Sequence, residues 1–230
     1  MAVLNLRSLA GGRILRGSQP FGMDTAATAD FLERHGIKTV VDLRSEYERA
    51  IVPWQLANGS MSKAPVELVE NPLDPRTASD GLQSIRTAED LGELYLGWVR
   101  TRLDWVAESL RPAAHGKRTL IHCSLGKDRT GVVSALALLA SGAGHAAVIA
   151  DYAASTAALP TMLKTMAAAW RLAVPEVPEE AFSPSLMLLQ SPEAAMEYFL
   201  DRFGLEFGSA ADYLREAGLS GSELDGLRRQ

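Results

Sequence analysis

The one cysteine of this 230-residue chain constrains the fold most, because it stands where two kinds of secondary structure meet. Leu120 and Ile121 belong to an apolar, β-type run at 118–122, and Cys123 follows it directly. A short loop ends at Arg129, and residues 130–141 then predict a helix that is apolar on all sides and therefore buried. A strand, loop and helix in this order predict an α/β domain whose central sheet is flanked by helices.

The loop at 123–129 has the features of an anion-binding nest. A tight turn between a strand and a helix aims several backbone N–H groups at one point, where the helix dipole adds positive potential. That potential favours the thiolate form of Cys123, which is a nucleophile for phosphate esters. Arg129 can hold two phosphate oxygens with its planar guanidinium, and Gly126 lets the backbone turn inward. The sequence therefore predicts Cys123 as nucleophile, Arg129 as phosphate clamp and a cysteinyl-phosphate intermediate.

Asp128 is the unusual residue of this loop, because a carboxylate there would face a bound dianion and be repelled by it. It either turns away into an ion pair, or it is protonated when substrate binds and serves as the general acid. Two other aspartates are rivals for the acid role. Asp74 lies between prolines in a turn-rich stretch, and Asp90 also fits a capping box with Thr87.

Residues 122–131, His-Cys-Ser-Leu-Gly-Lys-Asp-Arg-Thr-Gly, resemble the signature of the cysteine-dependent protein tyrosine phosphatase superfamily. The Gly-Lys-Asp-Arg-Thr-Gly ending is similar to one branch, the bacterial atypical phosphatases that act on phosphotyrosine, phosphoserine/threonine and phosphoinositides. Weaker similarity extends over residues 5–18, 40–48, 151–152 and 213–229. The resemblance implies a protein tyrosine phosphatase-like fold and a single phosphatase domain over residues 1–230.

The resemblance also implies a role for each loop residue. Asp128 would be the acid, in place of the mobile-loop aspartate of ordinary tyrosine phosphatases. Lys127 would be an extra phosphate contact, since animal phosphoinositide 3-phosphatases also carry a lysine within the loop. Thr130, directly after Arg129, is placed to hydrogen-bond the sulfur of Cys123. The expected substrate-binding residues are Ser124, Leu125, Gly126, Lys127, Thr130 and Gly131.

Three further residues are expected to support the loop. The other histidines are not spaced as metal ligands would be, so a metal role for His122 is disfavoured. His122 is expected instead to form a hydrogen bond near the loop. Asp42 and Arg44 follow a predicted strand and are expected to form a buried ion pair beside the site, with direct substrate contact as the alternative. No metal and no cofactor are expected.

Periodicity and turn signals predict the remaining elements. The predicted helices cover 24–35, 87–110, a stretch from 146 through 152, 192–204, 209–217 and 221–229, and the other strands cover 37–43 and 66–69. Residues 159–190 are rich in Met and Ala and are interrupted by prolines. Because the resembling family has helical cover here, we predict a helical lid at 159–204, with ordinary core-packing helices as the alternative.

Composition narrows the partners and the compartment. A formal net charge of −5 disfavours nucleic acid and a polybasic membrane anchor as general partners. No run approaches the ~20 apolar residues of a transmembrane helix, and the N-terminus shows no signal peptide. A single cysteine allows no internal disulfide, which suits the cytoplasm, although export without a cleaved signal stays open. The sequence does not set the oligomeric state.

The expected activity is a metal-independent phosphomonoesterase acting on phosphotyrosine, with a range that extends to other phosphoproteins. Three alternatives remain. A phosphoinositide or inositol phosphate phosphatase is favoured by Lys127. A phospho-binding pseudoenzyme is disfavoured because Cys123, Asp128 and Arg129 are all retained. A sulfur-transfer or arsenate-reducing protein is disfavoured by the Arg129-Thr130 ending and by the absence of a second cysteine.

Overall fold

The computed structural model describes residues 2–9, 11–56, 65–75 and 84–228. Within them, five strands form the larger sheet in the order β2-β3-β7-β5-β6, parallel except for the β2–β3 pair. These strands are β2 (Arg7–Ser8), β3 (Ile14–Gly17), β5 (Thr39–Asp42), β6 (Glu67–Glu70) and β7 (Thr119–His122). A second, two-stranded sheet pairs β1 (Ala2–Val3) with β4 (Pro20–Phe21). The predicted α/β fold with a central sheet is thus confirmed.

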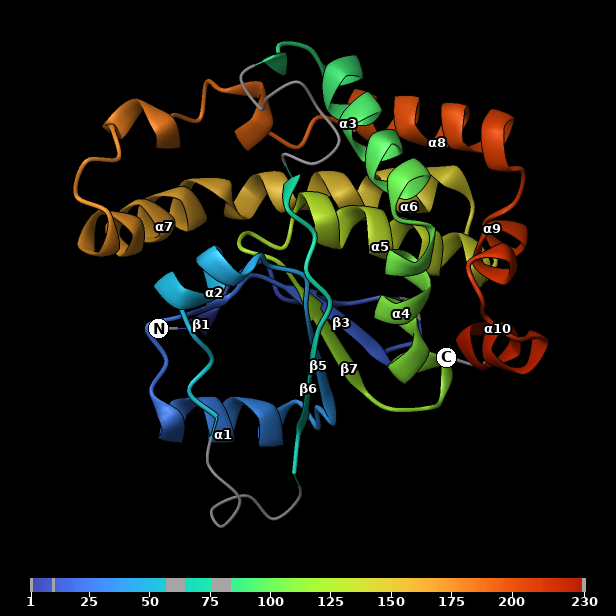
Figure 1. Ribbon diagram of the computed structural model, residues 1–230, viewed down its shortest axis with the longest axis horizontal. Coiled ribbons are helices and arrows are strands. Elements are labelled where there is room, and N and C mark those ends of the chain that lie inside the picture. The colour runs from blue at the N-terminus through green and yellow to red at the C-terminus, as the bar shows by residue number, and fades with distance from the viewer. Residues whose placement is uncertain (1, 10, 57–64, 76–83, 229–230) are drawn as a thin grey trace.

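Helices make up most of the rest of the chain (Figure 1). They are α1 (Thr25–Arg34), α2 (Glu46–Ile51), α3 (Ala88–Thr101), α4 (Leu103–Ala114), α5 (Asp128–Ala140), α6 (His145–Ala153), η3 (Ala154–Ala158), α7 (Leu159–Ala173), η4 (Glu179–Phe182), η5 (Met187–Leu189), α8 (Glu193–Phe207), α9 (Ala210–Glu216) and α10 (Gly221–Arg228).

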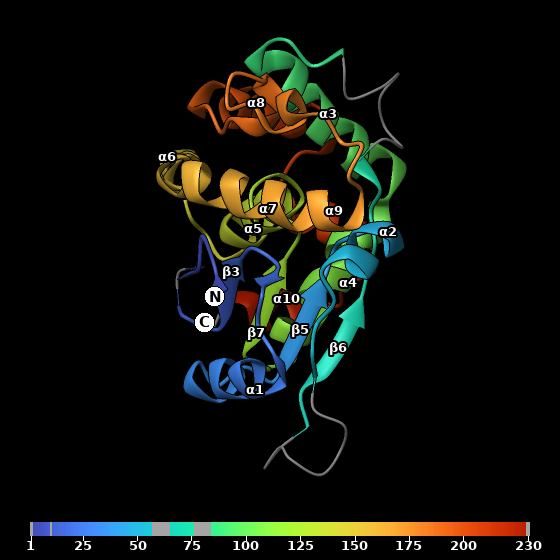
Figure 2. The ribbon, with the colours of Figure 1, turned by 90° about the vertical axis from the view of Figure 1, so that its left-hand side faces the viewer.

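The two faces of the sheet are buried against different layers, because successive strand residues point to opposite sides. Val40 and Leu120 pack with Phe31 of α1 in one apolar cluster. Val41 and Ile121 face the opposite way, into a larger cluster that includes residues of α3, α4, α5 and α8. Figures 1 and 2 show this order, with α1 at one end of the view, the α5–α7 layer beyond the sheet, and α3 with α8 farthest out.

The predicted helix at 87–110 is divided in two. It begins as expected at a capping box in which Thr87 and Asp90 exchange hydrogen bonds. Arg102 then takes φ −133° and ψ 68°, outside the helical region, so that α3 ends at Thr101 and α4 begins at Leu103. The apolar periodicity continues across this break, which explains why the pattern predicts a single helix.

The stretch predicted as a lid, 159–204, has two parts. Its last part is α8, whose residues Met196 and Phe199 belong to the main core, so that this helix packs as ordinary core. Its first part, α7 with the segment 174–191, packs through Met162 and Leu189 on Leu125 of the loop at 123–129. We call residues 174–191, which include η4 and η5, the strap.

Among the residues that the structure describes, one helical run reaches membrane-spanning length. From His145 to Ala173, α6, η3 and α7 form a continuous run of 29 residues. The most apolar 18-residue window of this run has a mean hydropathy of 1.2, and 33% of that window is buried. By length and composition this run could cross a membrane, which differs from the sequence expectation that no segment could. A single helix of this kind is weak evidence, because the core helix of a water-soluble protein passes the same test.

Candidate active site

The carbonyl oxygens of the phosphate loop, residues 123–129, are held on its outer side by the N-terminal part of the chain. The backbone N–H of Gln19 donates to Ser124 O at 3.1 Å. The side chain of Asn5 donates to the carbonyls of residues 125 and 126, at 3.3 and 3.1 Å. The buried guanidinium of Arg16 donates to the carbonyls of residues 126 and 127, at 2.8 and 3.3 Å. These contacts fix the loop from behind, where no substrate would lie.

The N–H groups of the same loop remain available. Across the described ranges, no protein acceptor takes a hydrogen bond from the N–H groups of residues 124–127. The loop runs directly into the N-terminus of α5, which begins at Asp128. Free amides at a helix N-terminus attract an anion through both hydrogen bonding and the helix dipole. The loop therefore has the free amides that the predicted anion nest requires.

Gly126 is required at its position for two reasons. Its φ of +66° lies in the left-handed region, which residues with a side chain rarely adopt. A Cβ built on it would lie 2.1 Å from the backbone oxygen of Gly17 on β3. The loop can approach the neighbouring strand this closely only because it has a glycine here.

Arg129 is oriented by a residue that sequence analysis did not assign to the site. Glu48 on α2 accepts from both terminal nitrogens of Arg129, at 2.6 and 2.7 Å. The carbonyls of Leu43 and Leu73 also accept from Nη1, at 3.2 and 3.0 Å. Among the described residues nothing accepts from Nε, so that the Nε edge of the guanidinium stays free for two phosphate oxygens.

The Glu48 carboxylate is stabilised in its charged form. Burial opposes ionisation, but the charge of Arg129 and hydrogen bonds from Arg129 and Ser124 outweigh it and hold the pKa of Glu48 far below its usual range. The same pairing raises the pKa of Arg129 despite its burial. The Ser124 hydroxyl, expected to bind substrate, donates to Glu48 at 2.6 Å instead. A sequence signal for Glu48 exists, because it closes a capping box with Ser45, but that motif says nothing of Arg129.

Cys123 lines a cavity of about 410 Å³. The loop residues Ser124, Leu125, Asp128 and Arg129 also line this cavity. The expected hydrogen bond from Thr130 to the sulfur is not formed, since the Thr130 hydroxyl is buried without a partner in the described structure.

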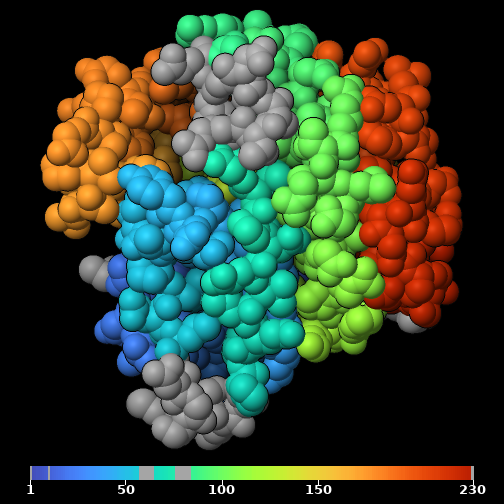
Figure 3. All heavy atoms as spheres, viewed as in Figure 1, coloured from blue at the N-terminus to red at the C-terminus, as the bar shows by residue number. Residues whose placement is uncertain are grey.

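The wall of this cavity away from the loop is apolar and aromatic. Tyr47 on α2 and Trp170 on α7 meet edge to face across the mouth, with ring centroids 5.7 Å apart. The remaining wall residues include Trp98, Met166, Val177, Phe182, Leu188 and Leu189. In the space-filling view, α2 and the orange residues of α7 and the strap border each other on one face (Figure 3). The site is therefore a pocket between the main body and the strap.

Asp128 lines the cavity and is also held in place. Its Oδ1 accepts from the Tyr95 hydroxyl and from Lys127 Nζ. The Tyr95 hydroxyl in turn forms a hydrogen bond of 2.7 Å with the Tyr152 hydroxyl. Burial is the larger cause of the raised pKa of both tyrosines, and the charge of Asp128 is the second. Both alternatives for Asp128 are thus visible, since it forms an ion pair and still reaches the pocket. Of the rivals, Asp74 lines the same cavity, whereas Asp90 accepts only helix-capping hydrogen bonds at an exposed site.

The side chain of Lys127, expected from the sequence to be an extra phosphate contact, is directed away from the cavity over Cys123. It is fully buried and does not line the cavity. Its ammonium donates to Asp128 Oδ1, to Leu188 O at 3.1 Å and to Gln190 O at 2.5 Å. Since an ammonium has three donors, all three are used. Gly131, also expected to bind substrate, lies instead against the Tyr152 ring. A Cβ built on Gly131 would be 3.1 Å from a carbon of that ring.

His122 supports the loop as a neutral ring. The Trp54 indole, which can only donate, bonds to Nε2 at 2.8 Å, so the proton lies on Nδ1, which faces Cys123 O at 3.1 Å. Burial lowers the pKa of His122 to about 4, although Asp42 opposes the shift. Among the described residues, no three metal-ligating side chains gather in one place.

Asp42 and Arg44 form the predicted buried ion pair, at 2.6 Å, and neither lines the cavity. They flank Leu43, whose carbonyl receives Arg129 and whose N–H donates to His122 O at 2.9 Å. Their contribution is therefore to fix the backbone to which the clamp is attached.

Sequence comparison with known proteins identifies the family of this chain. A model of the tyrosine phosphatase family matches residues 3–230. The chain belongs to the tyrosine phosphatase family. It is 27% identical to the triple specificity protein phosphatase PtpB of Mycobacterium tuberculosis, over 96% of this chain and 91% of that protein. It is 28% identical to a putative tyrosine-protein phosphatase of Cupriavidus necator, over 92% of this chain and 76% of that protein.

Two solved structures are also similar to this tyrosine phosphatase family member. TpbA of P. aeruginosa matches with a TM-score of 0.39 and 18% identity, covering 72% of this chain and 91% of that one. The catalytic domain of the PP-IP phosphatase SIW14 of S. cerevisiae matches with a TM-score of 0.41 and 16% identity, covering 90% and 94%. The family expected from the loop signature is confirmed by the match over nearly the whole chain.

Proposed function

We propose that this protein is a metal-independent phosphomonoesterase that acts through a cysteinyl phosphate, with phosphotyrosine as its preferred substrate. The observation that carries the proposal is the loop from Cys123 to Arg129, with its outward carbonyls held and its inward amides free. A phosphate dianion placed over those amides would lie above the sulfur and beside the free edge of Arg129. Membership of the family supports the phosphatase activity itself.

The reaction would proceed in two steps. The Cys123 thiolate attacks phosphorus, an S–P bond forms, and the P–O bond to the leaving group breaks as Asp128 donates a proton to the departing oxygen. A water molecule then attacks phosphorus while Asp128 takes its proton. The S–P bond breaks, and orthophosphate and the thiolate are released. Arg129 stabilises the equatorial oxygens in both transition states.

The pocket wall supports phosphotyrosine over an inositol phosphate. Tyr47 and Trp170 provide apolar faces for an aryl ring above the loop. Arg129 is the one cation among the described residues that line the pocket, and Lys127 is directed to the strap. A headgroup with several phosphates would require further positive charge at this mouth.

A substrate panel tests this proposal directly. Phosphate release from a phosphotyrosine peptide, a phosphoserine peptide and phosphoinositides is compared without added metal, with Cys123→Ser as the blank. Faster turnover of phosphotyrosine is expected. Faster turnover of the lipids would replace the substrate assignment, and release no higher than the blank with every substrate would refute the enzymatic proposal in favour of a phosphate-binding role.

Replacing Asp128 by Asn separates the acid candidates. Turnover of an alkyl phosphate, whose leaving group needs protonation, should fall by about 100-fold or more. Turnover of p-nitrophenyl phosphate should fall far less, because its leaving group departs readily as an anion. Asp74→Asn is the matched control in the same pocket. If Asp74→Asn shows the leaving-group dependence and Asp128→Asn does not, the acid is Asp74.

A further inference from the structure

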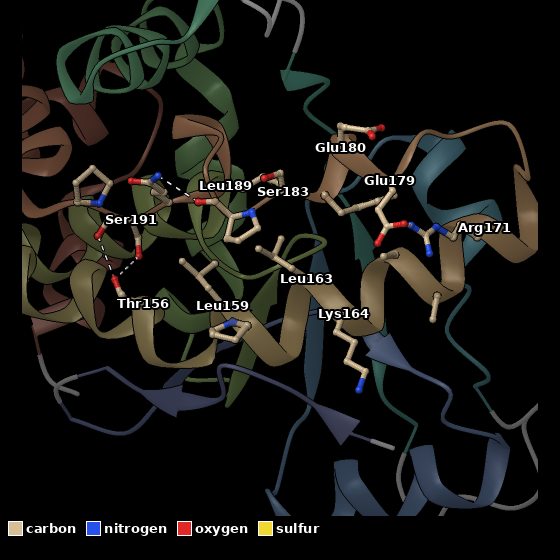
Figure 4. Close-up of a pocket in the computed structure, with 17 residues that line it drawn as sticks. Thr156, Leu159, Leu163, Lys164, Arg171, Glu179, Glu180, Ser183, Leu189 and Ser191 are labelled. Carbon is tan, nitrogen blue, oxygen red and sulfur yellow. Dashed lines mark hydrogen bonds and ion pairs between the residues drawn. The ribbon is translucent and has the colours of Figure 1, made fainter.

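The strap separates two cavities. On one side lies the pocket over Cys123, and on the other a larger cavity of about 1060 Å³ between the strap and α7 (Figure 4). Phe182 and Leu189 line both. Leu189 is the one buried apolar side chain in the strap, and Phe182, Met187 and Leu188 are only partly buried against the core, so apolar packing alone holds this segment weakly.

Polar contacts therefore have a large share in holding the strap. Thr156 meets Ser191, the last residue of the strap, at 2.9 Å, and Arg171 meets Glu179 within the strap at 3.4 Å, as Figure 4 shows. The second pair is exposed, and exposed ion pairs contribute little. The contact between the strap and the phosphate loop is different, because Lys127 donates two hydrogen bonds to strap carbonyls from a buried position.

The same ammonium also holds Asp128. Oδ1 of Asp128 accepts from Lys127 and from the Tyr95 hydroxyl, so two donors fix one oxygen of the carboxylate. Oδ2 accepts no hydrogen bond from the described residues. The carboxylate thus keeps one oxygen for the leaving group and uses the other as an anchor.

We propose that Lys127 is a positioning residue that ties the strap to the carboxylate of Asp128, and that its ammonium group is not a ligand of the substrate phosphate. The role in catalysis rests on the function proposed above. To reach a phosphate, Lys127 would have to give up an ion pair and two buried carbonyl contacts, which would leave those groups unpaired. With the tie intact, a closed strap and a correctly held acid occur together.

The wild-type protein provides a test that needs no substitution. Lysines are labelled by reductive methylation and quantified by peptide mass spectrometry, with the exposed Lys38 and Lys164 as internal references. Lys127 should label about tenfold or more slowly than these, because labelling requires local opening. Orthovanadate in the site should leave its protection unchanged. Rapid labelling of Lys127 that vanadate suppresses would identify a phosphate ligand and overturn the proposal.

A pair of variants tests the tie itself. Lys127→Met and Tyr95→Phe each remove one donor from Asp128, but only Lys127→Met frees the strap. Lys127→Met should raise the rate of Cys123 alkylation by iodoacetamide, and of proteolysis within 174–186, by about tenfold, whereas Tyr95→Phe should change neither. Both should lower turnover of alkyl phosphates more than that of p-nitrophenyl phosphate.

The outcomes separate this proposal from the proposed function. Unchanged alkylation and proteolysis in Lys127→Met, together with a raised Ki for vanadate, would overturn the tie even if the protein is an efficient phosphatase. Faster alkylation and proteolysis in a protein that hydrolyses no phosphate ester would support the tie and refute the function. If Lys127→Met does not fold, the labelling experiment on the wild-type protein decides.

Discussion

Replacing Glu48 by Gln tests whether Arg129 depends on a carboxylate from α2. The substitution keeps the size of the side chain, and Gln also serves at this position of a capping box, so α2 retains its N-terminus. The substitution removes the negative charge that pairs with Arg129. Both side chains of this pair are largely buried, with Arg129 7% exposed and Glu48 13% exposed. Glu46→Gln, an exposed change in the same turn of α2, is the matched control.

The size of the effect follows from the contacts that remain. Removing one partner of a buried ion pair costs about 3–5 kcal/mol, and because Arg129 keeps two carbonyl acceptors beside a cavity, about 2–3 kcal/mol is expected here. For a chain of this size that corresponds to a fall in Tm of about 5–10 °C. Since the guanidinium is no longer fixed, kcat/KM should also fall by about 10–100-fold.

Oxyanion binding and pH give two further measurements on the same variant. Because the guanidinium is no longer fixed, vanadate should bind Glu48→Gln less tightly and raise its Tm less than that of the wild type. The pKa of Glu48 is depressed from its ordinary 4.5, so its contribution is complete above that pH and is lost as pH falls below it. The difference in Tm between the two proteins should therefore shrink below pH 4.5. An unchanged Tm at neutral pH, with equal vanadate shifts, would refute the reasoning.

Two other substitutions probe the backbone and the histidine. Gly126→Ala should abolish most activity and lower Tm more than Gly142→Ala does. Both glycines have a positive φ, but only a Cβ at position 126 would meet a neighbouring atom, the oxygen of Gly17. Equal falls in Tm in a thermal melt would contradict the close approach. Trp54→Phe removes the N–H that occupies Nε2 of His122 and should let that ring protonate more easily. Because the wild-type pKa is lowered from 6.5 to about 4, wild-type stability falls as pH drops through this range, and the variant should show a smaller fall in Tm.

The central part of the site could be predicted because its signal is local. The strand, the loop and the helix around Cys123 are adjacent in sequence, and an apolar run followed by Gly126 and Arg129 specifies the nest without further information. The helix cap at Asp24 and the capping box at Thr87 are local in the same sense, and the structure has both.

What could not be predicted depends on residues that are distant in sequence. Glu48 lies 81 residues before Arg129, and no pattern in either segment records that they meet. Lys127 was assigned to phosphate because it belongs to the loop, but its direction is set by carbonyls 61 and 63 residues later. The division of the lid is similar, because only the packing of α8 on α3 shows that this helix belongs to the core.

The contacts behind the phosphate loop have a consequence for how this protein tolerates change at its beginning. Asn5, Arg16 and Gln19 touch no reacting atom, yet they hold the carbonyls whose amides would bind phosphate. A chain that lacks only the first five residues would keep β3 and the main apolar core, yet it would lose the hydrogen bonds from Asn5 to the loop carbonyls. Circular dichroism would report such a protein as folded, and only anion binding would reveal the defect. Structural integrity and catalytic competence should therefore separate at the N-terminus, where a trimmed or tagged version of the protein is most readily made.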